Sequence, residues 1–195
     1  MKPWLKHCWR VVLFALTLDQ VTWLAASISA VALLVIIGLT RPGLRRLFGA
    51  LLGGLFFAAL ALVLDRVAFQ LALWHYPFTH SASGPLGFYV AAGFFYGAGM
   101  ALVGWRITRR FGRLGVLIWL SCFAIYGPSR DELGAALASR AGLQVLVFAP
   151  GSVPVLVDAL GWVVCVAGAL LVMRLVARPD QADRLARQRV DRRCA

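Results

Sequence analysis

Two aspartates interrupt long apolar runs of this chain, and they are the residues best suited to chemistry. Asp65 lies between the apolar stretches 47–64 and 67–74, and Asp158 lies within the run 153–176. A charged side chain at the centre of a membrane costs on the order of 2.5–3.5 kcal/mol on insertion scales, so such residues are functional candidates. Asp65 and Asp158 are therefore candidate catalytic groups for acid–base or electrostatic chemistry.

Each aspartate also has an explanation that involves no function. Neighbouring residues of a helix point about 100° apart, so Arg66 need not pair with Asp65. The two would then lie at the membrane interface, with the Arg66 side chain reaching the head groups. Asp158 follows the break Pro150–Pro154 closely, and a carboxylate near a helix N-terminus is stabilised by the helix dipole.

Other polar side chains are expected on the same side of the membrane. Arg130 follows Tyr126–Pro128 and is expected to pair with Asp65 or Asp158, or to bind an anionic head group. Several polar groups converging on an apolar bundle describe a ligand site, although the loops of any membrane protein look similar. Asp131 is the third candidate catalytic residue. The candidate substrate-binding residues are Arg66, His75, Tyr76 and Arg130.

No metal or cofactor is expected from the sequence. His75 and His80 are five residues apart with Pro77 between them, which is poor spacing for two ligands on one helix face, and no H-E-x-x-H motif occurs. The chain contains no P-loop and no G-x-G-x-x-G motif. Its four cysteines form no C-x-x-C pair; they are Cys8, Cys122, Cys165 and Cys194. Trp74 and Tyr76 fit an aromatic belt at the membrane interface.

One local pattern resembles the small multi-pass lycopene cyclases of carotenoid synthesis. It consists of Asp65, then Trp74 and Tyr76, and then Pro85 near the start of the next apolar run. Those cyclases carry acidic residues directly after the corresponding proline, whereas this chain continues with 86–88, Leu-Gly-Phe. The similarity is confined to this segment and does not identify the chain as a member of that family.

Composition indicates which elements must hold these residues. The 195 residues are 61% hydrophobic and 14% charged, whereas soluble domains carry about 25% charged residues. The net charge of +12 does not indicate nucleic-acid binding, because the basic residues flank apolar runs instead of forming one face. The sequence predicts an all-α, multi-pass transmembrane bundle with membrane lipids as its surroundings.

About five spans are predicted, and possibly six. Residues 1–18 form a basic lead-in helix at the interface, or else a sixth crossing, and residues 177–195 form a basic tail. The transmembrane domain covers 19–176, with spans at about 19–40, 47–66, 86–105, 114–127 and 153–176.

Arginines predict the orientation of these spans. They concentrate in the loops 41–46 and 106–113 and in the tail, which the positive-inside rule places in the cytoplasm. We therefore expect a bacterial inner (plasma) membrane protein with a cytoplasmic C-terminus, although Lys2, Lys6 and Arg10 contradict the rule. The spacings Gly49-x-x-x-Gly53 and Gly93-x-x-x-Gly97 favour close helix packing, within the chain or with a membrane-protein partner.

Three functions fit the sequence. The first is a small non-catalytic membrane module or complex subunit. The second is an intramembrane enzyme acting on a lipid or isoprenoid through Asp65, Asp158 and Arg130. The third is a small transporter coupled to protons or cations, which the absence of a detected inverted repeat makes weaker.

Overall fold

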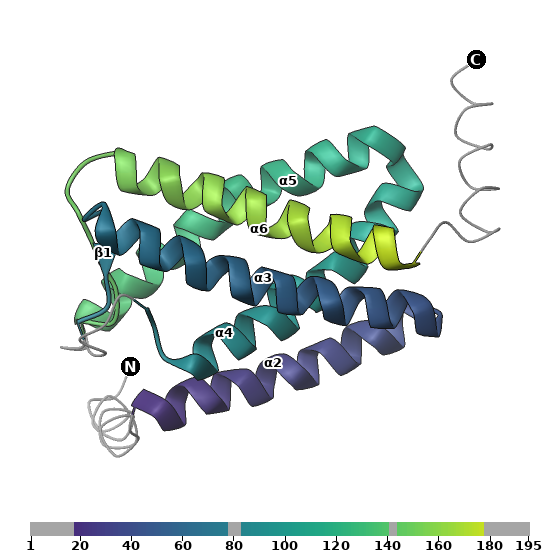
Figure 1. Cartoon of the computed structure of the whole chain (residues 1–195), viewed down its shortest axis with the longest axis horizontal. Coiled ribbons are helices and arrows are strands. Elements are labelled where there is room, and N and C mark those ends of the chain that lie inside the picture. The colour runs from purple at the N-terminus through teal and green to yellow at the C-terminus, as the bar shows by residue number, and fades with distance from the viewer. Residues whose placement is uncertain (1–17, 78–82, 141–143, 178–195) are drawn as a thin grey trace, which may run out of the picture.

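The protein is a bundle of helices, as Figure 1 shows for a computed structural model that describes residues 18–77, 83–140 and 144–177. This confirms the predicted all-α class. In these residues four helical runs are long and apolar enough to cross a membrane, namely Thr22–Thr40, Leu44–Gln70, Leu86–Arg140 and Val153–Ala177. The predicted lead-in segment before residue 18, the tail beyond residue 177 and His80 lie outside the described residues.

The third of these runs divides into two arms at Gly112. Its 55 residues would extend about 80 Å if straight, against about 30 Å of membrane hydrocarbon. Gly112 breaks the helical path with φ 58° and ψ −132°, a conformation that disfavours residues with a Cβ atom. The first arm consists of α4 (Leu86–Ala92), a π-helical segment η1 (Gly93–Gly99) and the start of α5 (Met100–Arg140), and the rest of α5 forms the second arm.

The two arms pack antiparallel. Gly104 lies against the Trp119 ring, Gly115 lies against the backbone of Ile107, and the Tyr96 and Tyr126 hydroxyls are 3.2 Å apart. Residues at increasing distance from Gly112 in one arm thus contact residues at increasing distance from it in the other arm. The chain therefore turns back on itself at Gly112. With both arms counted, the described chain passes along the bundle five times, as predicted.

The second arm is longer than the predicted span 114–127. The helix α5 continues through Pro128 to Arg140, so Arg130 and Asp131 are helical residues and do not begin a loop. Proline removes one backbone hydrogen bond, which usually ends a helix. The carbonyl that loses its usual donor is that of Ala124, four residues before Pro128, and the helix nevertheless continues. The Ser129 hydroxyl donates a 2.7 Å hydrogen bond to the next carbonyl, that of Ile125.

Glycines bring the central helices into backbone contact. On α3 (Leu44–Gln70), a Cβ atom added at Gly53 would lie 2.5 Å from the Ala169 carbonyl oxygen of α6 (Val153–Ala177). One added at Gly97 of η1 would lie 2.5 Å from the Gly54 Cα of α3. The predicted small-residue spacings therefore serve packing within the chain.

The two ends of the bundle differ in chemistry. The link between α2 (Leu18–Thr40) and α3, the bend of α5 and the end of α6 lie together at one end, the arginine end (Figure 1). There the Arg46 guanidinium lies 4.0 Å from the Trp105 ring centroid, and Arg106 donates to the Thr40 carbonyl at 2.6 Å. The opposite end carries the loops around β1 (Trp74–His75) and β2 (Val147–Phe148), and we call it the loop end.

Apolar side chains cover the outside of the bundle. Leu39 is 75% exposed, Leu175 is 69% exposed and Leu55 is 68% exposed, on three different helices. Such a surface is stable against hydrocarbon, and together with the apolar helices it indicates an integral membrane protein.

Replacing Gly53 by alanine is expected to lower the stability of the folded bundle by about 1–3 kcal/mol, because its Cβ would overlap the backbone of α6. Thermal unfolding of the detergent-solubilised protein measures the change. The control is Gly38→Ala in α2, where nothing lies within 4 Å of the new Cβ and alanine favours the helix. Equal losses for the two variants would contradict the packing described here.

Candidate functional site

A cavity of about 720 Å³ opens between the helices towards the loop end. On α3 its lining extends from Phe57 to Ala68, a distance of about 17 Å along the helix. Most lining side chains are apolar or aromatic, such as Leu64, Leu133 and Val157. Four lining residues are charged, and they come from three helices: Asp65 from α3, Arg130 and Asp131 from α5, and Asp158 from α6. The structure thus brings the three candidate catalytic aspartates to one cavity.

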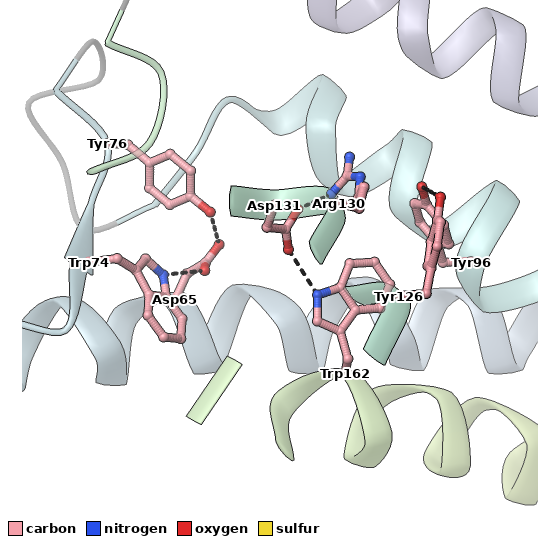
Figure 2. A network of polar contacts seen from close by, with 8 residues as sticks. All are labelled: Asp65, Trp74, Tyr76, Tyr96, Tyr126, Arg130, Asp131 and Trp162. Atoms are coloured by element: carbon pink, nitrogen blue, oxygen red, sulfur yellow. Dashed lines mark hydrogen bonds and ion pairs between the residues drawn. The ribbon is translucent and has the colours of Figure 1, made fainter. Parts of the chain in front are cut away.

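Asp65 is held by three neutral donors. Its side chain is buried (8% exposed), and its Oδ1 accepts a 3.0 Å hydrogen bond from Trp74 Nε1. Its Oδ2 accepts bonds from the Tyr76 hydroxyl at 3.0 Å and from the Tyr89 hydroxyl at 2.5 Å; Figure 2 shows the bonds from Trp74 and Tyr76. Because hydrogen bonds offset the cost of burying a carboxyl group, these donors explain how Asp65 is tolerated there.

This network attaches the segment after α3 to the bundle. Trp74 was predicted to lie in an interfacial belt, but it is 7% exposed and its ring faces Phe148 at 5.9 Å. Trp74 also pairs with Phe148 across the short antiparallel ladder of β1 and β2. Burial and the adjacent Asp65 carboxylate raise the pKa of Tyr76, so its hydroxyl remains a donor. Asp65 therefore fixes the wall that closes the loop end of the cavity.

A second carboxylate, Asp131, has a charged partner. Its Oδ1 contacts the guanidinium of Arg130, and its Oδ2 accepts a 2.8 Å hydrogen bond from Trp162 Nε1 of α6 (Figure 2). The expected pairing of Arg130 with Asp65 or Asp158 is therefore replaced by one with its own neighbour. Gly127 makes the Trp162 bond possible, because a Cβ atom there would overlap the Trp162 ring.

Aromatic rings surround the Arg130 guanidinium. Its central carbon lies 5.3 Å from the Tyr96 ring centroid, 5.6 Å from that of Phe88 and 5.8 Å from that of Trp162. Each distance is within the range of a cation–π interaction. With Asp131 as counter-charge, Arg130 is a neutralised cation in an aromatic wall, so it is poorly placed to attract an anionic head group.

Asp158 differs from the other two aspartates. It is partly buried in the cavity wall, and its Oδ2 is shielded from solvent without a hydrogen-bond partner among the described residues. The helix dipole does not account for it, since α6 begins at Val153 with no acidic residue in its first turn, where that effect is strongest. Unsatisfied buried oxygens are rare in folded proteins and require an explanation.

The four candidate substrate-binding residues fall into two groups. Tyr76 and Arg130 line the cavity, whereas Arg66 and His75 are exposed and do not. Within the described part of the chain, no group of three or more His, Cys, Asp or Glu side chains is arranged to hold a metal ion. Besides carboxyl groups, phenols and one guanidinium, the lining includes the Cys165 thiol and the hydroxyls of Thr22 and Ser129.

Comparison with protein-family models, with curated proteins and with solved structures finds no match for this chain.

One lining residue, Trp162, was not singled out from sequence, because an aromatic residue in an apolar run usually packs against lipid or core. Tyr89 donates to Asp65 but is not itself part of the cavity lining. The only available signal for Trp162 was its spacing four residues after Asp158, which places both on one face of a helix.

Asp65→Asn is expected to destabilise the fold by about 1–3 kcal/mol, because the amide presents its own N–H groups to tryptophan and tyrosine donors. Thermal unfolding followed by tryptophan fluorescence measures the loss. Glu132→Gln is the matched control, since the same chemical change falls on an exposed side chain outside the cavity. If both variants unfold at the wild-type temperature, Asp65 does not anchor the loop end.

Proposed function

We propose that this integral membrane protein is an intramembrane enzyme that acts on a lipid, an isoprenoid or a comparably apolar substrate in the cavity. Support comes from the size and lining of the cavity, because ligand sites are mostly apolar pockets of about 300–1,000 Å³ with a few convergent polar groups. On α3 the cavity lining extends over about 17 Å, which suits an extended hydrocarbon chain.

The observation that carries the proposal is the unsatisfied Oδ2 of Asp158. A buried carboxyl oxygen without a partner is costly for the fold, and we propose that a substrate supplies the missing contact. Asp158 is therefore proposed as the acid–base group. In its carboxyl form it gives a proton to the substrate, and in its carboxylate form it takes one back.

The other charged lining residues have supporting roles in this proposal. Asp65 positions the loop wall through Trp74 and Tyr76, and its oxygens are already occupied by donors. Arg130 and Asp131 hold each other and add little net charge. Of the three aspartates that line the cavity, Asp158 is thus the one with an oxygen that no described residue satisfies.

Asp158→Asn is expected to abolish the activity while leaving the protein folded, because asparagine has the same shape but does not exchange protons near neutral pH. The test compares lipid extracts of cells that carry the wild-type gene, a deletion, Asp158→Asn or Glu132→Gln. Mass spectrometry should find that Asp158→Asn reproduces the lipid changes of the deletion, with a substrate accumulating and a product lost. Glu132→Gln should match the wild type, because its side chain is exposed and outside the cavity.

A contrary result would support another function. If the deletion changes no lipid but impairs a membrane complex, and Asp158→Asn behaves as wild type, the protein is a non-catalytic subunit. Uptake or efflux that depends on Asp158 without any new lipid species would indicate a carrier.

A further inference from the structure

The charges that line the cavity do not balance. Three aspartates face one arginine, and Arg130 is engaged by Asp131. Asp65 accepts hydrogen bonds from three neutral donors of the described chain, Trp74, Tyr76 and Tyr89. The cavity therefore contains more acidic groups than basic ones, and Asp158 is the acidic group with an unsatisfied oxygen.

The aromatic lining favours a cation as well. Trp162 lies one helical turn from Asp158 on α6, and its ring is 4.9 Å from that of Tyr96 and 5.9 Å from that of Phe57. The faces of such rings attract positive charge, and the same wall already holds the guanidinium of Arg130. Asp158 lines the same cavity as these rings, and the cation of that cavity, Arg130, has its ion pair with Asp131 instead of Asp158.

An inorganic cation does not fit this place. Calcium and magnesium require several oxygen ligands around one point, and no suitable group of side chains occurs in the described residues. An anionic group would meet Asp65, Asp131 and Asp158, with its natural partner Arg130 already engaged. The walls around these groups are apolar, so the ligand that complements them is a positively charged nitrogen on a hydrocarbon body.

We propose that the substrate of this cavity is an amine-bearing amphiphile whose nitrogen pairs with Asp158. This rests on the proposed function, since it names the substrate class of the same site. The amine enters from the membrane in its neutral form. The Asp158 carboxyl group transfers its proton to the amine nitrogen, so that one O–H bond breaks, one N–H bond forms, and an ammonium–carboxylate pair remains beside Trp162.

A matched series of ligands tests this inference on the purified full-length protein in nanodiscs of uncharged lipid. Dodecylamine, dodecanol and dodecanoic acid share a chain and differ in the charge of the polar end. Quenching of tryptophan fluorescence reports binding, because Trp74 and Trp162 line the cavity. We expect the wild type to bind dodecylamine at least about tenfold more tightly than the other two.

Variants distinguish binding of the ligand in the cavity from its general partitioning into the bilayer. Asp158→Asn should lose the preference for dodecylamine, and Glu132→Gln should keep it. Saturable binding of dodecanol by both wild type and Asp158→Asn, with no preference for the amine, would overturn the inference while leaving an apolar-substrate cavity. Failure of all three ligands to bind saturably would overturn this inference, and an unchanged lipid profile in Asp158→Asn cells would separately overturn the proposed function.

Discussion

The cost of placing a carboxyl group in apolar surroundings is the constraint on which this structure depends. The three aspartates at the loop end differ in how far hydrogen bonds and charges offset this cost. Asp65 receives three hydrogen bonds from aromatic donors, and Asp131 receives a guanidinium and an indole N–H. Asp158 keeps one shielded oxygen without such a partner. Two satisfied aspartates hold the walls of the cavity, and the third is the one for which we propose a contact with a substrate.

Backbone geometry makes these contacts possible. Glycines at positions 53, 54 and 97 let the central helices approach closely, and Gly127 leaves room for the Trp162 ring that reaches Asp131. The short ladder of β1 and β2 joins the two loops that close the cavity, so its backbone groups are paired where they adjoin the membrane. Packing and polar chemistry are thus linked, because the site would not assemble without the close contacts.

The membrane fold was predictable because its signals are local. Apolar runs long enough to cross a bilayer and arginines at their ends are visible in any single sequence. The extent of the fourth span was not predictable, since Pro128 and the polar pair Arg130–Asp131 resemble a helix end in the sequence, whereas α5 continues through them to Arg140. Asp65 and Asp158 could be named from sequence because charges in apolar runs are rare, and the structure places both of them, with Asp131, in the lining of one cavity. The partners Tyr89 and Trp162 could not be named, since they act across helices that sequence spacing cannot relate.

The central claim is that Asp158 holds a ligand in the cavity. Native mass spectrometry of the protein, released gently from its own membrane, tests it most directly. Our account predicts that the wild type retains a bound small molecule of defined mass and that Asp158→Asn, folded to the same extent, loses it. Identical spectra for the two proteins, with no bound molecule or with the same bulk lipids on each, would contradict the account.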